Sequence, residues 1–272
     1  MTKAKREMEA HLKLVDAAVE VRDARCPLAT QNPDLERLLS KKPRVIVLNK
    51  RDLANADITQ AWIDAFKREG TQAVSFSATQ KAGKAQLLKA LDTALTPQRE
   101  RWKQRGVDKT MRVLICGIPN VGKSSIINAL CVGGRAKTGA KPGLTRGMQW
   151  LRIGPRLELM DSPGLLWPRL DDQALALHLC YINAIRDEIL EEQQIATRLA
   201  TELMQLAPKA MEERYGIIHE GPGDFLTAIA KRRGFLLKGG ALDEDKAARA
   251  ILEDFRDGKL GRVTLETPGG KP

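Results

Sequence analysis

Two patterns of apolar and polar positions divide the chain. Up to about residue 160, short apolar runs alternate with amphipathic segments, which is typical of a mostly parallel sheet flanked by helices. The apolar runs predict strands at 17–21, 45–48, 73–76, 112–116, 149–153 and 156–160. Helical spacing predicts helices at 2–15, 33–39, 59–68, 87–95 and 125–130. The first part of the chain is therefore expected to have an α/β fold.

Beyond this part the strand-like runs stop, and only helical spacing continues. Helices are predicted at 171–185, 188–206, 223–233 and 243–255. We expect two domains, an α/β domain over 1–168 and a smaller all-α domain over 169–268, with a disordered tail after Pro268. Residues 97–112 are expected to form a strongly basic connector around Trp102, which either faces RNA or is simply solvated.

Composition adds an excess of positive charge to this picture. The 272 residues are 43% hydrophobic and 29% charged, and the formal net charge is +11. Such an excess indicates either a polyanionic partner, usually nucleic acid, or a merely solubilising surface. No apolar run is long enough for a membrane span and the first residues lack a signal peptide, so a cytosolic protein without membrane contact is expected. The four scattered cysteines argue against a disulfide framework or a zinc site.

A phosphate-binding loop is the most specific motif of the chain. Residues 117–124 read Gly-Ile-Pro-Asn-Val-Gly-Lys-Ser, which matches GxxxxGK[ST] between a predicted strand and a predicted helix. The glycines let backbone N–H groups surround phosphate oxygens, and the helix N-terminus adds its positive dipole end. Lys123 is expected to reach the β- and γ-phosphates, and the Ser124 hydroxyl to ligate Mg²⁺. The loop residues expected to bind nucleotide are Asn120, Val121, Gly122, Lys123, Ser124 and Ser125.

A guanine-reading motif lies earlier in the chain. The strand at 45–48 is followed by Asn-Lys-Arg-Asp, an NKxD motif. The Asp52 carboxylate can accept hydrogen bonds from guanine N1–H and the exocyclic amine, a pair of donors that adenine lacks. Asn49 is expected to tether the neighbouring loops, and the Lys50 stem to cover the base. The motif therefore predicts selection of GTP over ATP.

Further predicted site residues follow other strands. Ser77 and Ala78 come after the next strand and are expected to offer a backbone N–H to guanine O6. Thr145, in a glycine-rich basic loop, is the expected switch residue that closes on Mg²⁺ and the γ-phosphate. Asp161 is expected to hold Mg²⁺ through a water, and the N–H of Gly164 to sense the γ-phosphate.

The order of these motifs is itself informative. The guanine motifs precede the phosphate loop and the switches, whereas in an ordinary GTPase they follow the phosphate loop. One circular permutation explains every placement, with residues 96–111 joining the old ends. The second switch then runs almost directly into the predicted helical domain. Loss of the γ-phosphate is therefore expected to move that domain.

These features together resemble the RbgA/YlqF family of ribosome-assembly GTPases. The likeness extends from about Lys3 to about Glu266 and includes Asp-Ser-Pro-Gly-Leu-Leu-Trp-Pro at 161–168 and Lys-Arg-Arg-Gly-Phe-Leu-Leu-Lys-Gly-Gly at 231–240. It implies a GTPase that acts late in maturation of the large ribosomal subunit, with its C-terminal domain on ribosomal RNA. It further implies GTP, GDP and Mg²⁺ as ligands, a large-subunit precursor as partner, and a cytoplasmic, ribosome-associated location. Bacterial and mitochondrial members both fit.

The catalytic residue is not assigned by the sequence. Leu165 stands where Ras-like proteins keep a water-orienting glutamine, and an apolar side chain cannot orient the attacking water. The resemblance points to a histidine in a Trp-Phe-Pro-Gly-His segment, whereas this sequence begins at the residues just after it. Hydrolysis is therefore expected to be slow alone and stimulated by ribosomal particles. A nucleotide-gated RNA-binding scaffold with little hydrolysis stays as the alternative function.

Asn120 of the phosphate loop has two interpretations. The resemblance implies that it helps bind K⁺, which would supply positive charge where an arginine finger otherwise acts. In the other interpretation it merely caps the turn.

Overall fold

The computed structural model describes residues 3–131, 150–162, 172–185, 191–217 and 224–270. Six strands form one sheet in the order β3-β2-β1-β4-β6-β5, and every neighbouring pair is parallel except β5 and β6. The strands are β1 (Ala17–Asp23), β2 (Arg44–Asn49), β3 (Gln72–Ser75), β4 (Met111–Cys116), β5 (Trp150–Gly154) and β6 (Leu157–Asp161). The predicted α/β class with a mostly parallel sheet is confirmed.

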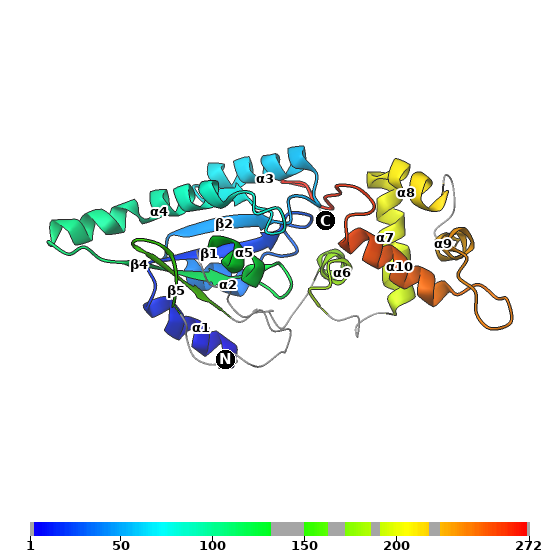
Figure 1. Cartoon of the computed structure of the whole chain (residues 1–272), viewed down its shortest axis with the longest axis horizontal. Coiled ribbons are helices and arrows are strands. Elements are labelled where there is room, and N and C mark those ends of the chain that lie inside the picture. The colour runs from blue at the N-terminus through cyan, green and yellow to red at the C-terminus, as the bar shows by residue number, and fades with distance from the viewer. Residues whose placement is uncertain (1–2, 132–149, 163–171, 186–190, 218–223, 271–272) are drawn as a thin grey trace.

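Helices cover both faces of the sheet (Figure 1). Those of the α/β part are α1 (Lys3–Lys13), α2 (Pro33–Leu39), α3 (Ala56–Arg68), α4 (Lys84–Gln104) and α5 (Lys123–Leu130). α4 and α5 pack on the face that carries Val19, Val47 and Ile115. α1, α2 and α3 pack on the opposite face, beside Ala18 and Ile46. Because both faces are covered, β2 and β4 are largely apolar on both sides, as their sequences indicate.

Two helices differ from the predictions. The connector expected over 97–112 is helical as far as Gln104, so α4 continues through Pro97. A proline inside a helix costs about 3 kcal/mol. Buried Leu91 and Leu95 hold the turns before Pro97, and the residues after it have high helix propensity. The short helix α8 (Pro208–Tyr215) was not predicted, although a proline in the first turn is a typical start signal.

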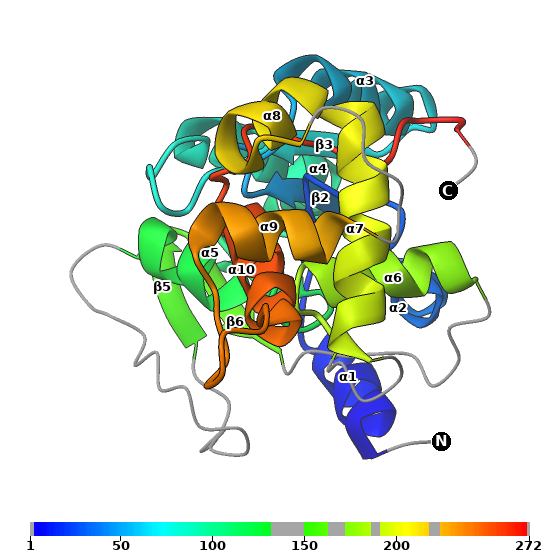
Figure 2. The same cartoon turned by 90° about the vertical axis from the view of Figure 1, so that its right-hand side faces the viewer.

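The described chain from residue 172 onward is a group of helices beside the carboxyl ends of the strands (Figures 1 and 2). It comprises α6 (Gln173–Tyr181), α7 (Glu192–Leu206), α8, α9 (Phe225–Arg233) and α10 (Glu244–Arg256), and we call it the helical part. Its buried Leu199, Ile229 and Ile251 belong to the same continuous apolar core as the α4–α5 face of the sheet. In the described ranges no helix combines the length and the apolar character that a membrane span needs. The boundary predicted at 168 and 169 lies outside the described residues.

After α10 the chain returns to the α/β part. The backbone N–H of Val263 donates to the Leu53 carbonyl at 3.2 Å, and that of Leu265 donates to the Arg25 carbonyl at 2.8 Å. The Trp62 indole N–H donates to the Glu266 carbonyl at 2.9 Å. We call residues 260–266 the return segment. It fastens the end of the helical part to the β1–α2 loop and to α3.

A buried histidine joins the return segment to the helical part. His178 of α6 lies between the carboxylates of Glu266, 2.8 Å from Nδ1, and Glu202, 3.2 Å from Nε2. Glu266 also accepts the N–H of Ala29 at 3.1 Å, and Glu202 accepts the Tyr181 hydroxyl at 2.8 Å. Burial alone would lower the pKa of His178, but its bonds to the two carboxylates outweigh burial and raise the pKa to about 9. At neutral pH the imidazolium form of His178 therefore holds α6, α7 and the return segment together.

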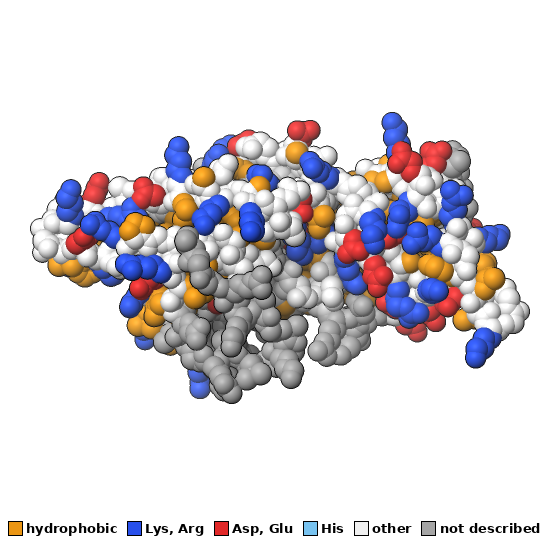
Figure 3. Space-filling model, viewed as in Figure 1, with side chains coloured by type: hydrophobic (Ala, Val, Ile, Leu, Met, Phe, Trp, Pro, Cys, Tyr) orange, Lys and Arg blue, Asp and Glu red, His pale blue; other side chains and the backbone are white. Residues whose placement is uncertain are grey.

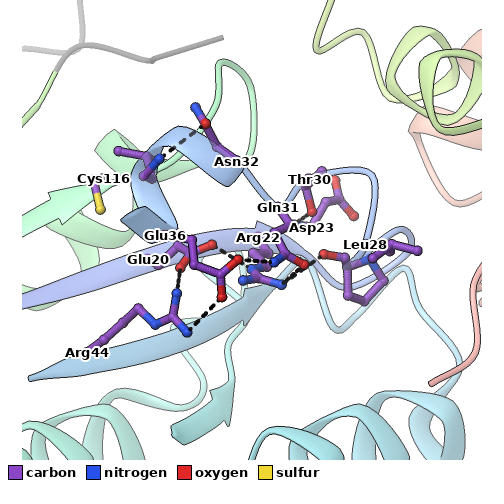
Figure 4. A network of polar contacts seen from close by, with 12 residues as sticks. Glu20, Arg22, Asp23, Leu28, Thr30, Gln31, Asn32, Glu36, Arg44 and Cys116 are labelled. Atoms are coloured by element: carbon purple, nitrogen blue, oxygen red, sulfur yellow. Dashed lines mark hydrogen bonds and ion pairs between the residues drawn. The ribbon is translucent and has the colours of Figure 1, made fainter. Parts of the chain in front are cut away.

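A second polar network lies under the β1–α2 loop (Figure 4). Glu20 and Arg22 of β1 are both 1% exposed, and Arg22 Nε donates to Glu20 Oε1 at 2.7 Å. Arg44 of β2 donates to the other Glu20 oxygen at 3.1 Å, and Arg22 also donates to Gln31 Oε1 at 3.2 Å. These bonds pair the buried charges of Glu20 and Arg22, which would destabilise the folded protein strongly if they had no partners.

The His178 cluster predicts a pH-dependent stability. Because the folded-state pKa lies above the unfolded value of about 6.5, the stabilisation is complete below about pH 6.5 and is lost as the pH rises through about 9. His178→Gln should cost about 3–5 kcal/mol at neutral pH, since it leaves the buried carboxylate of Glu266 without its charge partner. Thermal unfolding from pH 6 to 10 should show the Tm gap between wild type and variant shrinking as the pH rises from about 6.5 to about 9 and levelling off above that. A constant gap would contradict this assignment.

Candidate nucleotide-binding site

The sheet order brings the predicted motifs to one edge. β2, β1, β4 and β6 are consecutive and parallel, so the loops that follow them lie side by side at their carboxyl ends. Ligands of open α/β sheets bind at this edge. The NKxD motif follows β2, the phosphate loop follows β4, and Asp161 ends β6. Residues far apart in the chain therefore share one location.

Asn49 connects the guanine motif to the phosphate loop. Its side-chain Nδ2 donates to the Val121 carbonyl at 2.8 Å. Gly122 is in the left-handed region at φ 95°, and a Cβ there would lie 2.3 Å from Asn49 Nδ2. Only glycine allows this close approach. The tethering role expected of Asn49 agrees with this contact.

Lys123 lies inside the phosphate loop at the start of α5. Its ammonium donates to the carbonyls of Gly117 at 3.2 Å and Ile118 at 2.8 Å, and the residue is 9% exposed. Burial lowers the pKa of Lys123, against the opposing effect of Asp161. A phosphate beside this ammonium would favour the charged form. The position therefore suits the predicted phosphate contact.

Ser124 and Asp161 meet where a divalent cation is expected. Ser124 Oγ and Asp161 Oδ2 are 3.5 Å apart. Asp161 Oδ1 is buried and has no hydrogen-bond partner among the described residues. Burial raises the pKa of this carboxyl, although Lys123 opposes the shift. A hydroxyl and a carboxylate in contact are oxygen ligands of the kind Mg²⁺ prefers, so the residues present fit that ion.

The guanine side is built around Asp52. Thr79 Oγ1 donates to Asp52 Oδ2 at 3.1 Å, and Oδ1 is buried without a partner in the described part of the chain. Asn49 Oδ1 is likewise buried and without a hydrogen-bond partner among the described residues. A buried acceptor of this kind is suited to the N–H donors of guanine. Ser77 stands next to this site, because its hydroxyl lies 3.0 Å from Thr79 Oγ1.

Some predicted residues are placed differently or not at all. Thr145, Gly164 and Leu165 lie outside the described residues. Asn120 adopts φ 61°, and its Nδ2 donates to the carbonyl of Asn183, just after α6. This contact between the phosphate loop and the helical part was not predicted, and the proposed K⁺ contact of Asn120 stays a prediction. Thr79 was also missed, although a hydroxyl two residues after Ser77 is a usable signal.

Fold, site and motif order define a P-loop GTPase with a circularly permuted chain. A family model described as 50S ribosome-binding GTPase matches residues 112–213. Ribosome biogenesis GTPase A of Bacillus cereus is 40% identical over 271 residues, which is 98% of this chain and 92% of that protein. The chain belongs to the ribosome biogenesis GTPase A family.

Solved structures agree with this assignment. The crystal structure of GNP-bound YlqF from T. maritima matches with a TM-score of 0.71 and 33% identity, covering 98% of both chains. The GDP-bound YlqF structure matches with a TM-score of 0.69 and 31% identity, covering 97% of this chain and all of that one (100%). The predicted GTPase activity and the predicted resemblance are confirmed. Family membership favours hydrolysis over the alternative of a scaffold with little hydrolysis.

The role of Asp52 in guanine recognition can be tested by replacing its carboxylate with an amide. Asp52→Asn should lower GTP affinity by about 10- to 100-fold, because a hydrogen bond to a charged group contributes about 1.5–3 kcal/mol. The same variant should gain affinity for xanthosine triphosphate, whose C2 carbonyl can accept from the asparagine amide. Titration calorimetry with both nucleotides measures the two effects. Asp57→Asn, an exposed acid-to-amide change in the first turn of α3, is the control, and unchanged base preference in Asp52→Asn would contradict the assignment.

Proposed function

We propose that this GTPase is an assembly factor for the large ribosomal subunit and that its nucleotide state controls its attachment to the precursor particle. The observation that carries the proposal is the hydrogen bond from Asn49 to the Val121 carbonyl, which joins the NKxD motif to the phosphate loop. The names of the relatives support the ribosomal role. Such a role implies a cytoplasmic location in contact with ribosomal RNA.

In the proposed pocket each side chain has a distinct part. Asp52 accepts the guanine N–H donors, with Asn49 holding its loop against the phosphate loop. Lys123 contacts the β- and γ-phosphates, and Ser124 and Asp161 hold Mg²⁺. Bound Mg²⁺ would neutralise charge on the phosphate oxygens. Ribosomal particles are proposed to stimulate the reaction, since Leu165 cannot orient the attacking water.

The surface of the helical part suits a polyanionic partner. Lys231, Arg232 and Arg233 are exposed at the end of α9, and the loop between α9 and α10 then projects from the helical part (Figure 1). The projection carries Leu236 and Leu237, which are 59% and 52% exposed. Lys and Arg side chains gather over this part of the molecule in Figure 3, with acidic side chains among them. Positive charge around exposed apolar side chains supports contact with RNA and ribosomal protein.

Coupling between pocket and helical part has a structural basis. α6 is the first described helix after β6, and Asp172 caps its N-terminus. Asn120 of the phosphate loop contacts Asn183 immediately after α6. A change at the phosphates therefore has two short routes to α6: the chain between β6 and α6, and this contact. Both support movement of the helical part on loss of the γ-phosphate.

Attachment can be tested by sedimentation with large-subunit precursors. We expect the protein to sediment with the particles in a non-hydrolysable GTP analogue and to be released in GDP. Lys123→Ala should show no difference between the two nucleotides, because its phosphate contact is lost. Lys89→Ala, an exposed lysine of α4, should behave like the wild type. Equal sedimentation of the wild type in both nucleotides would overturn nucleotide control.

The basic cluster can be tested through salt dependence. Replacing Lys231, Arg232 and Arg233 by alanine should weaken binding to ribosomal RNA. It should also reduce the slope of log affinity against log salt by about 2, if all three contact phosphates. The matched control removes three exposed charges from the α/β part, Lys41, Lys67 and Arg68. Equal slopes in the two variants would contradict a specific role for the cluster.

A further inference from the structure

Asp23, at the end of β1, is bound to the lysine of the guanine motif. The residue is fully buried, and its Oδ2 lies 2.9 Å from Lys50 Nζ. In the parallel register Asp23 is paired with Asn49, so it lies directly beside the first residue of the guanine motif. Burial opposes ionisation of Asp23, but the charges of Arg25 and Lys50 outweigh it and hold the pKa of Asp23 below its usual range. The contact is therefore a full ion pair at neutral pH.

The same carboxylate also binds Arg25. Nε and the backbone N–H of Arg25 both donate to Asp23 Oδ1 at 3.0 Å, and Nη2 donates to Oδ2 at 2.9 Å. Arg25 is itself 1% exposed. This two-bond geometry fixes the guanidinium in one orientation. Asp23 consequently connects Lys50, at the guanine motif, with the buried Arg25.

Arg25 continues the connection into the helical part. Its Nη1 donates to the Phe255 carbonyl at 3.2 Å, at the last turn of α10. The guanidinium carbon lies 5.0 Å from the centroid of the Phe255 ring. Beyond it, Phe255 packs edge-on against Tyr181 of α6, and Arg256 donates to the Tyr181 carbonyl at 2.8 Å. A continuous set of contacts thus leads from Lys50 to α10 and α6.

We propose that Asp23 positions Lys50 for guanine binding and, through Arg25, joins the base side of the pocket to α10. The proposal rests on the proposed nucleotide pocket and adds a link that does not depend on the γ-phosphate. Lys50 adopts the left-handed φ of 61° and is 25% exposed at its side chain. With its ammonium held by Asp23, the four-carbon stem of Lys50 can lie over the base without losing its charge partner. Base binding then stabilises one arrangement of Lys50, Asp23 and Arg25.

The same strand supplies a matched control. Glu20 precedes Asp23 by three residues, is 1% exposed and binds two arginines, Arg22 and Arg44. It differs from Asp23 because its side chain lies on the other face of β1, among the contacts that Figure 4 shows beneath the β1–α2 loop. The loss of a buried carboxylate charge can therefore be compared between Asp23, which contacts Lys50, and Glu20, which binds Arg22 and Arg44.

The test is a double-mutant cycle on GDP affinity, measured by titration of the full chain. Asp23→Asn is expected to weaken GDP and GTP binding equally, by about tenfold. If Asp23 acts through Lys50, adding Asp23→Asn to Lys50→Ala should change affinity by less than about twofold. Glu20→Gln should lower the Tm but leave affinity within about twofold of the wild type. Additive effects of Asp23→Asn and Lys50→Ala, or wild-type affinity in Asp23→Asn, would overturn the proposal.

A second variant covers the case in which Asp23→Asn does not fold. Lys50→Met keeps the stem at a partly exposed position but removes the ammonium, so it should weaken GDP binding about as much as loss of Asp23. Wild-type affinity in Lys50→Met would overturn the positioning role. Failure of the wild type to bind GDP would instead overturn the proposed pocket, so the two failures are distinguishable.

The connection to α10 has its own readout. Hydrogen exchange of residues 244–256 should slow when GDP binds to the wild type. Arg25→Lys keeps a charge beside Asp23 but loses the planar two-bond contact, so the exchange of this helix should no longer respond even when GDP is saturating. An unchanged response in Arg25→Lys, or no response in the wild type, would overturn the connection.

Discussion

The hydrogen bond from Asn49 to the Val121 carbonyl holds the two halves of the site together. These residues are 72 positions apart in the chain, yet β1 lies between β2 and β4 and brings their carboxyl ends within reach. Gly122 completes the contact because no side chain stands in the way of the Asn49 amide. Sheet order, and not chain order, thus decides which loops meet. A permuted chain can keep the pocket because every strand pairing is retained.

Sequence patterns predicted most of the fold because its elements depend on local information. Strands covered on both faces read as apolar runs, and amphipathic helices follow the period of 3.6 residues. The phosphate loop was predicted because its glycines and its flanking strand and helix all lie within a few residues. The extension of α4 through Pro97 was missed, since buried side chains of the preceding turns outweigh the local effect of a proline.

Contacts between distant segments could not be read from local patterns. No periodicity relates Glu266 to Ala29, which are 237 residues apart, or Arg25 to Phe255, which are 230 apart. The sequence Arg-Asp-Ala-Arg at 22–25 did carry a signal, because charged residues at the carboxyl end of a parallel strand face the ligand edge. What remained hidden was the partner of each charge. The return segment and α10 supply those partners, and they fasten the helical part at its far end as well as at α6.

The position of α4 between the two motifs has a consequence for the integrity of the chain. Residues 105–108, directly after α4, are exposed. A single backbone cut there would leave Asn49 and Asp52 on one piece and Lys123 and Ser124 on the other. Neither piece would carry a complete set of proposed ligands, yet the strand pairings of β1 with β2 and β4 give the two pieces a surface on which to reassemble. The permuted GTPase is thus divided at this loop into two complementary fragments, each with half of a nucleotide site.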